Sequence, residues 1–230
     1  MRVLVIEDDP TTSEAIQLIL RSEGYVVHGA DLGEEGIELA RLYEHDIIVL
    51  DLMLPDIDGY QVLNRLRDNR VRTPVLVLSG LAELEDKLKA LGIGADDYLT
   101  KPFDRRELVA RISAIVRRAN GYADPVINVG RMSIDLNGRF ARSENGPIPL
   151  TAKEFSILEL LALRKGKTVS KAAILDHLYG GIDEPEMKTV DVFVCKLRAK
   201  IAEACKGDNY IVTNRAQGYR LTEPNAEAGA

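Results

Sequence analysis

This 230-residue sequence has little cysteine and no long apolar segment. Its two cysteines, Cys195 and Cys205, are too few for a disulfide framework and lack the spacing of metal ligands. We interpret both as structural thiols, with redox sensing as the minor alternative. No segment approaches the run of about eighteen uncharged apolar residues that a membrane span needs, and the start MRVLVIEDD reaches acidic side chains too early for a signal peptide. We therefore expect a cytoplasmic protein that does not enter a membrane.

Basic residues are outnumbered by acidic ones, 30 against 36, and the formal net charge of −6 has the wrong sign for a protein that binds nucleic acid. The charge is unevenly divided, however. Residues 1–120 hold 15 Lys and Arg against 22 Asp and Glu, whereas residues 121–230 hold 15 against 14. Within 187–220 there are seven basic residues against three acids, an excess suited to phosphate contact. A solvated basic face is the competing interpretation.

The first half of the chain alternates short apolar runs with amphipathic stretches, which predicts a five-stranded parallel sheet in an α/β domain. Ligands of such sheets bind beyond the carboxyl ends of the strands. The strongest strand signals are 3–6, 47–51 and 74–79, the weaker ones are 25–29 and 97–100, and helices are expected at 11–23, 34–44, 58–68, 83–91 and 104–118.

The second half predicts a small antiparallel sheet over 126–149, where LNG and ENGP supply turn residues, then three helices and a hairpin over 210–221. This is an α+β arrangement. The helix starts are marked by a capping box of Thr151 and Glu154, by Ser170 as a cap, and by Pro185 at the start of a long helix to about Cys205.

Length and composition favour two domains, because 230 residues with 46% hydrophobic content can form two cores of ordinary size. The segment NGYADP has the composition of a linker. We place the first domain at 1–119, the linker at 120–125, the second domain at 126–223 and a disordered tail at 224–230.

Acidic residues follow two strands of the predicted sheet. EDD at 7–9 comes directly after the first strand and Asp51 ends the third, so these carboxylates should meet at one edge. Clustered carboxylates are stable chiefly around a hard divalent cation, and Mg²⁺ is the natural candidate. Ser79 and Lys101 end the fourth and fifth strands and would supply a hydroxyl and a cation for phosphate oxygens. Solvated loop acids and helix caps are the commoner explanation of acids taken singly.

Four segments together resemble the receiver domains of two-component systems. The resemblance covers the whole first half and implies a doubly wound, flavodoxin-like sheet. It also implies that the phosphoryl donor is a cognate histidine kinase or phosphotransfer protein. The segments are EDD at 7–9, DLMLPDIDG at 51–59, LSG at 78–80 and GADDYLTKPF at 94–103.

This resemblance implies roles for the residues of the pocket. Asp51 would accept the phosphoryl group, because a carboxylate is a competent nucleophile when a metal and a lysine neutralise charge. Ser79 and Lys101 would bind the phosphoryl group, and Tyr98 would rotate inward as the switch, although core packing would explain Tyr98 alone. Asp9 is expected only to flank the site. The implied Mg²⁺ ligands are Glu7, Asp8, Asp51 and the backbone carbonyl of Met53.

A mixed-charge set resembles the pairing face of the OmpR/PhoB subfamily of response regulators. There, contacts of Lys87 with Glu107 and of Asp97 with Arg111 would join a homodimer that forms on phosphorylation. Ordinary solvated charges would look similar, and exposed ion pairs contribute only ~0 to 1 kcal/mol each, so they would set register more than strength. The set is Lys87, Asp96, Asp97, Glu107, Arg111 and Arg118.

The second half resembles the same subfamily from LTAKEFSILELLALRKG through DEPEMKTVDVFVCKLRAKI to GYRL. Within it, LRKGKTVSK, HLYGGIDEPEMK and VDVFVCKLR are especially similar to cell-cycle regulators of alphaproteobacteria. The implied fold is a winged helix-turn-helix. Its long third helix would enter the major groove of double-stranded DNA, and its hairpin wing would reach the minor groove.

Residues of the third helix and wing match positions that contact DNA in the subfamily. Val190, Val194 and Leu197 repeat instead at intervals typical of a core face. The wing departs from the usual pattern at Ala216, where a glycine is lost. The candidates are Lys188, Thr189, Lys196 and Arg198, with Val192 and Phe193 for thymine methyl groups and Arg215 for the minor groove.

We therefore expect a transcription factor, not a stand-alone enzyme, that dimerises on phosphorylation, binds tandem half-sites in promoters and contacts RNA polymerase. One alternative is a phosphorelay module whose second half binds a protein, against which the basic third helix argues. Another is a receiver that works without phosphate, which the intact acidic pocket disfavours.

Overall fold

A computed structural model describes residues 1–81, 83–180, 185–214 and 217–224. The chain divides into two compact units, Met1–Ala119 and Asn120–Ala230. The wing residues Arg215 and Ala216, and residues 225–230 of the expected tail, lie outside the described residues.

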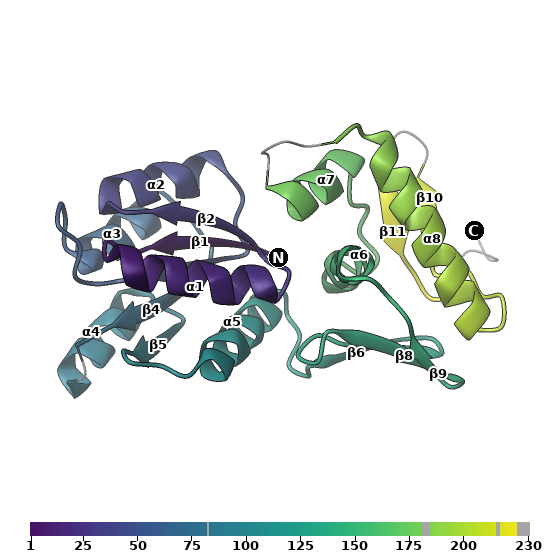
Figure 1. Cartoon of the computed structure of the whole chain (residues 1–230), viewed down its shortest axis with the longest axis horizontal. Coiled ribbons are helices and arrows are strands. Elements are labelled where there is room, and N and C mark those ends of the chain that lie inside the picture. The colour runs from purple at the N-terminus through teal and green to yellow at the C-terminus, as the bar shows by residue number, and fades with distance from the viewer. Residues whose placement is uncertain (82, 181–184, 215–216, 225–230) are drawn as a thin grey trace. The chain divides into compact units, whose positions relative to one another are not determined.

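The first unit has strands and helices that alternate along the chain. The strands are β1 (Arg2–Ile6), β2 (Val26–Ala30), β3 (Ile47–Leu50), β4 (Val75–Ser79) and β5 (Asp97–Thr100), and the helices are α1 (Pro10–Ser22), α2 (Gly33–Leu42), α3 (Gly59–Asp68), α4 (Leu84–Ile93) and α5 (Arg105–Ala119). All pairings are parallel, in the order β2-β1-β3-β4-β5. Helices α1 and α5 cover one face of the sheet, and α2, α3 and α4 cover the other (Figure 1). The predicted doubly wound, flavodoxin-like fold is thus confirmed.

Burial explains why some strands of this sheet were easier to predict than others. Every residue of β1, β3 and β4 is buried, since helices cover both faces of the sheet. The edge strands β2 and β5 mix buried with half-buried residues, and β2 also has an exposed one. They correspond to the weaker signals at 25–29 and 97–100.

A close backbone contact fixes where α3 begins. The Gly59 N–H donates to the Leu52 carbonyl at 3.0 Å. A Cβ atom at Gly59 would lie 2.4 Å from the carbonyl oxygen of Asp51, so a side chain does not fit there without a backbone shift. The start of α3 is therefore pressed against the end of the strand region that carries Asp51.

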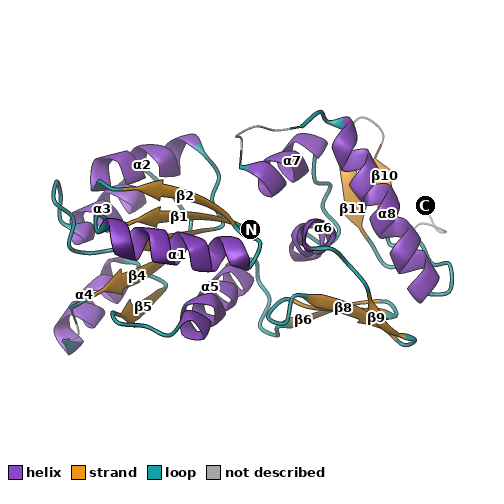
Figure 2. Ribbon diagram, in the orientation of Figure 1, coloured by secondary structure: helices purple, strands orange, loops and turns teal. Residues whose placement is uncertain are grey.

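The second unit is an α+β domain (Figure 2). A four-stranded antiparallel sheet, in the order β6-β7-β8-β9, precedes three helices and a two-stranded hairpin, and one hydrophobic core joins all of them. The elements are β6 (Val126–Val129), β7 (Met132–Asp135), β8 (Phe140–Ser143), β9 (Gly146–Ile148), α6 (Ala152–Leu163), α7 (Lys171–Tyr179), α8 (Lys188–Ala204), β10 (Ile211–Asn214) and β11 (Gly218–Leu221).

Two of the three predicted helix starts in this unit are confirmed. Thr151 and Glu154 form the capping box of α6, and the Ser170 hydroxyl accepts the Ala173 N–H at the start of α7. The third start was wrong, because α8 begins at Lys188 and not at Pro185. The preceding residues form a tight turn, in which the Thr189 N–H donates to the Glu186 carbonyl at 2.8 Å.

Candidate functional site

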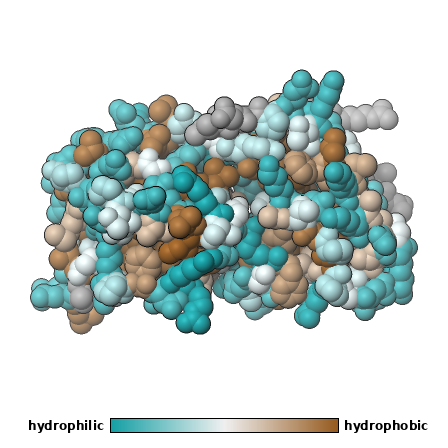
Figure 3. All heavy atoms as spheres, in the orientation of Figure 1, coloured by the Kyte–Doolittle hydropathy of each residue, from teal (hydrophilic) through white to brown (hydrophobic). Residues whose placement is uncertain are grey.

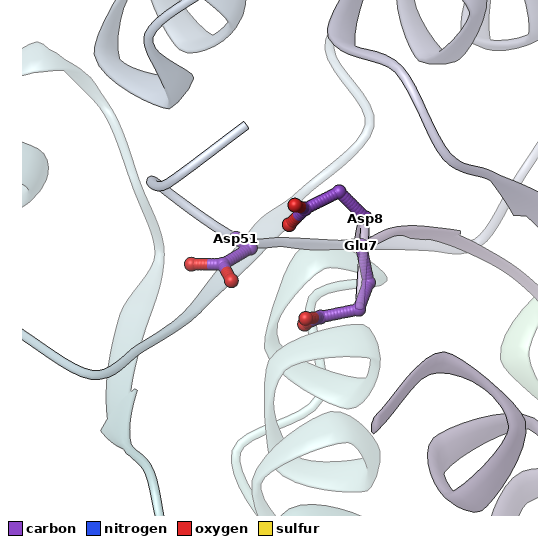
Figure 4. A group of neighbouring side chains, drawn as sticks. All are labelled: Glu7, Asp8 and Asp51. Atoms are coloured by element: carbon purple, nitrogen blue, oxygen red, sulfur yellow. The ribbon is translucent and has the colours of Figure 1, made fainter. Parts of the chain in front are cut away.

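Three carboxylates gather where β1 and β3 end. Glu7 and Asp8 follow β1, and Asp51 follows β3, which lies beside β1 in the sheet. One oxygen from each carboxylate lies within 4.8 Å of the others (Figure 4). Glu7 and Asp51 are buried, whereas Asp8 is more accessible. The parallel order of β1 and β3 brings the acids together, as expected from the sequence.

Lys101 completes this acidic pocket from the end of β5. Its Nζ lies 2.6 Å from a carboxylate oxygen of Glu7 and 2.6 Å from one of Asp51. It follows β5 and precedes a cis peptide bond to Pro102. One cation is therefore shared by two buried acids.

The electrostatics of the pocket reflect a surplus of negative charge. Burial raises the pKa of Glu7 to about 7, helped by Asp51, although the hydrogen bond from Lys101 opposes the shift. The pKa of Lys101 is also raised: burial would lower it, but hydrogen bonds to Asp51 and Glu7 outweigh that effect. Three clustered carboxylates, of which two share one lysine, are a donor set that suits a small divalent cation with oxygen ligands. The residues present thus fit Mg²⁺.

The other predicted pocket residues lie at the end of β4, within β5 and on the loop after β3. Ser79 is fully buried at the end of β4, and its hydroxyl accepts the Leu81 N–H at 3.3 Å. Tyr98 is buried and donates to the Leu81 carbonyl at 2.7 Å, and burial raises the pKa of its hydroxyl. The Met53 N–H donates to Asp51 at 3.1 Å, whereas the Met53 side chain is exposed. Only the backbone of Met53 adjoins the pocket.

Asp9 serves the fold rather than the acidic cluster. Its carboxylate accepts the Thr12 N–H at 2.8 Å and caps α1. Hydrogen bonding to Thr12 holds the pKa of Asp9 below its usual value. The expectation that Asp9 only flanks the site agrees with this geometry.

Helix α8 presents one buried and one exposed side. Val190, Val194 and Leu197 are buried, as their spacing predicted. Lys188, Val192, Cys195 and Lys196 are exposed on the other side. The interpretation of both cysteines as structural thiols therefore holds for Cys205, which is buried, but was wrong for Cys195.

Three other candidates on α8 are engaged within the second unit. Arg198 donates to the Ile211 carbonyl and to the Thr213 hydroxyl, both at 2.8 Å, and so braces the hairpin. Phe193 is half-buried against the core. Thr189 is half-buried, and its N–H belongs to the turn before the helix.

Comparisons with known proteins match both the unit that carries the acidic pocket and the unit that carries α8. Residues 3–113 match the family model of the response regulator receiver domain, and residues 145–221 match that of the C-terminal domain of transcriptional regulatory proteins. The chain belongs to the OmpR/PhoB-type response regulators. That family is one of transcriptional regulators rather than a class of enzymes.

Similar proteins extend over the whole chain of this response regulator. The cell cycle response regulators CtrA of Brucella anthropi and Brucella ovis are each 53% identical to it over 227 residues, covering 99% of this chain and 98% of the relative. The solved receiver domain of the Francisella response regulator 1452 is 37% identical, with a TM-score of 0.50, and covers 51% of this chain and 98% of that one. The predicted similarity to cell-cycle regulators is confirmed.

Some charged residues of the expected pairing face of this response regulator already have partners within the same chain. Arg111 contacts Asp97 and Glu107, each at 2.7 Å, and Lys87 lies 5.9 Å from the ring centroid of Tyr98. The Asp96 carboxylate has different partners. It accepts the Val75 N–H at 2.8 Å and lies 3.5 Å from Arg67 of α3. The structure thus places Asp96 apart from the set, while Arg118 is exposed near the end of α5.

Sequence reasoning missed a network that orients α8. Asp191 pairs with Lys171 of α7 at 2.7 Å and accepts a hydrogen bond from the Tyr219 hydroxyl of β11. These partners lie 20 and 28 residues from Asp191 along the chain. No local sequence pattern predicts contacts between residues this far apart, so the sequence alone would not have revealed them.

The surface of both units mixes polar and apolar residues on the face shown in Figure 3. Within the described parts of the chain, none of the helices is long and apolar enough to cross a bilayer.

Proposed function

We propose that this response regulator is switched by phosphorylation of Asp51 and controls transcription, as a CtrA-like regulator of the cell cycle. The observation that carries the proposal is the arrangement of Asp51, a buried carboxylate 2.6 Å from Lys101 and clustered with Glu7 and Asp8. A nucleophilic carboxylate beside a lysine and further acids suits phosphoryl transfer. The chain would act as a regulator, not as a stand-alone enzyme.

In the proposed reaction, an Asp51 oxygen attacks the phosphorus of a phosphohistidine on a histidine kinase or phosphotransfer protein. The P–O bond forms as the P–N bond breaks, and the imidazole leaves with the electron pair. Lys101 would neutralise charge on the phosphoryl oxygens, and the Ser79 hydroxyl would donate to one of them. Glu7, Asp8, Asp51 and the Met53 carbonyl would hold Mg²⁺, which when bound supplies further neutralisation.

The proposed switch runs from Ser79 to Tyr98. Both side chains are buried, and both make a hydrogen bond to Leu81 in the loop before α4. A shift of Ser79 toward a phosphoryl group would disturb the same loop that Tyr98 holds. This shared partner supports a role of Tyr98 as the switch residue.

Dimerisation would follow on the α4–β5–α5 face. There the contacts of Arg111 with Asp97 and of Lys87 with Glu107 would form between two copies. The pairs that Arg111 now makes within the chain are partly exposed, so exchanging them would cost little free energy. Asp96 and Arg118 are the weaker members of the proposed interface.

DNA would be bound by α8 and the wing, at tandem half-sites where RNA polymerase is also contacted. Lys188, Val192 and Lys196 lie on the exposed side of α8 and suit phosphates and a thymine methyl group. Thr189, Phe193, Arg198 and the wing residue Arg215 are proposed as further contacts on their match to the subfamily. Binding to promoter DNA would place the protein in the cytoplasm.

The test is incorporation of phosphate from acetyl phosphate with Mg²⁺ present. Asp51→Asn should abolish labelling, because the nucleophile is lost, whereas Asp68→Asn, an exposed acid at the end of α3, should label like the wild type. Wild-type labelling of Asp51→Asn would overturn the assignment.

Salt dependence of duplex binding separates DNA binding from the alternative in which the second unit binds a protein. Affinity should fall steeply with salt, and Lys196→Gln should reduce the slope of log affinity against log salt by about one. A duplex affinity that does not change with salt would favour the alternative.

A further inference from the structure

Tyr60 connects the first turn of α3 with the first turn of α4. Its side chain is buried, and its hydroxyl lies 3.1 Å from the Asp86 carboxylate and 3.3 Å from the Asp86 carbonyl. Burial, together with the bond to Asp86, raises the pKa of Tyr60 to about 12, so the hydroxyl stays a donor at neutral pH. The Lys89 ammonium lies 3.7 Å from the centroid of the ring. Tyr60 is thus held by two side chains of α4.

The backbone of Tyr60 is fixed to the phosphorylation pocket. Its N–H donates to the Asp58 carboxylate at 2.8 Å. The preceding residue, Gly59, bonds to Leu52 and leaves no room for a Cβ atom against Asp51. A backbone shift at Asp51 or Leu52 would therefore also move Tyr60, because close-packed groups transmit displacement.

Helix α4 is held on its other side by Tyr98, whose hydroxyl bonds to Leu81 before the helix. The helix lacks a side-chain cap of its own, since Glu83 at the cap position makes no such bond. Leu84 and Leu88 on its outer side are strongly exposed. Within the described residues, the start of α4 thus has no capping side chain and carries strongly exposed leucines, and a weakly held element responds readily to a small change in free energy.

We propose that Tyr60 is a positioning residue that couples the state of Asp51 to α4 through its hydrogen bond to Asp86. This inference rests on the proposed function, in which Asp51 accepts the phosphoryl group. It adds to the route through Ser79 and Tyr98 a second route on the α3 side of the helix. The arrangement with Tyr98 buried is the one expected of the phosphorylated receiver. The bond between Tyr60 and Asp86 is present in this arrangement and would stabilise it.

The experiment compares amide hydrogen exchange of α4 in the full chain, with Mg²⁺ alone and with Mg²⁺ and beryllofluoride. In the wild type, beryllofluoride should slow exchange across 84–93. Tyr60→Phe keeps the ring and its contact with Lys89 but loses the hydroxyl. The factor by which beryllofluoride slows exchange should therefore be roughly threefold to tenfold smaller, which corresponds to the free energy of one hydrogen bond. Tyr43→Phe, at a partly exposed tyrosine after α2, is the matched control and should respond like the wild type.

Variants of the acceptor distinguish positioning from simple support of the fold. Asp86→Asn keeps a side-chain oxygen for the Tyr60 hydroxyl and should respond nearly as the wild type does. Asp86→Ala removes the carboxylate but keeps the Asp86 carbonyl, 3.3 Å from the Tyr60 hydroxyl, so it should reduce the effect by no more than Tyr60→Phe does. Adding Asp86→Ala to Tyr60→Phe should change little, because Tyr60→Phe already removes the donor of both bonds. A purely structural role would speed exchange equally in both conditions and leave the beryllofluoride effect unchanged.

Two results would overturn the role of Tyr60: an unreduced beryllofluoride effect in Tyr60→Phe, or a wild-type α4 that does not respond to beryllofluoride. Phosphate incorporation from acetyl phosphate, measured on the same proteins, tests the proposed function separately. Normal incorporation with an unaltered α4 response in Tyr60→Phe would remove Tyr60 from the switch and leave Asp51 as the acceptor.

Discussion

Glu7 and Glu154 are two buried glutamates with similar partners and opposite electrostatics. Each residue is 2% exposed, and each lies within 2.7 Å of one lysine, Lys101 or Lys200. Burial and the nearby Asp51 raise the pKa of Glu7 to about 7. Burial would also raise the pKa of Glu154, but hydrogen bonds from Lys200 and Thr151 outweigh it and hold this pKa below the usual value.

The difference lies in how fully each charge is compensated. Glu154 accepts the Thr151 N–H at 2.8 Å within the capping box, and Lys200 donates to it at 2.7 Å. Glu7 must share Lys101 with Asp51. A buried charge with all its partners stabilises a fold, whereas an undercompensated one costs stability and leaves a place for a cation. The same residue type is thus structural in one unit and functional in the other.

The largest expected effect comes from removing the compensated acid. Glu154→Ala should destabilise the second unit by about 2 to 4 kcal/mol, because it leaves Lys200 without its buried partner and opens the capping box. Urea unfolding monitored in the second unit measures this, with Glu203→Ala, an exposed acid of α8, as the control. A loss no larger than that of the control would show that Glu154 is not structural.

Removing Glu7, the undercompensated acid, should raise stability instead of lowering it. Without divalent cations at pH 8, Glu7→Gln should stabilise the first unit by about 1 to 2 kcal/mol, since an ionised buried carboxylate beside Asp51 is no longer needed. Added Mg²⁺ should stabilise the wild type more than the variant, because ligand binding to the folded state adds stability. Destabilisation by Glu7→Gln under these conditions would contradict the comparison.

The pH dependence of stability should separate the two acids as well. The pKa of Glu7 is 4.5 in the unfolded chain and about 7 in the folded one. Between these two pH values folded Glu7 keeps a proton that the unfolded chain releases, so the contribution of Glu7 to the stability of the fold decreases as pH rises. For one proton the slope is at most about 1.4 kcal/mol per pH unit. Glu154, with a lowered pKa, contributes above 4.5 and loses that contribution as pH falls through its folded value. Unfolding in EDTA from pH 3 to 8, compared among the wild type, Glu7→Gln and Glu154→Gln, checks both shifts. If neither variant changed the dependence of stability on pH, the shifts would be refuted.

The smallest effect is expected where an ion pair is exposed. Arg111 and Glu107 are 36% and 45% exposed in their side chains and lie four residues apart on α5. Glu107→Gln should change the stability of the monomer by less than about 0.5 kcal/mol, since water and salt screen such pairs. A loss as large as that of Glu154→Ala would mean that burial does not govern these charges.

Local patterns were enough to predict much of both units. The apolar runs at 3–6, 47–51 and 74–79 marked the buried strands, and the spacing of Val190, Val194 and Leu197 marked the inner side of α8. The carboxyl ends of parallel strands meet at one edge of a sheet, so the meeting of Glu7 with Asp51 could also be expected. These features depend on periodicity and on the order of elements, which a sequence displays directly.

Only the tertiary structure decided how individual side chains are used. Asp8 and Asp9 are adjacent acids, yet one joins the acidic cluster and the other caps α1. Arg198 matches a DNA-contacting position of the subfamily, and only the structure shows that it also braces the hairpin. Tyr60 carried no signal of its bond to Asp86. Lys101 meets Glu7 across 94 residues of chain. Such pairings depend on distances of a few ångströms that arise only after helices and strands have packed, and no local spacing in the sequence encodes them.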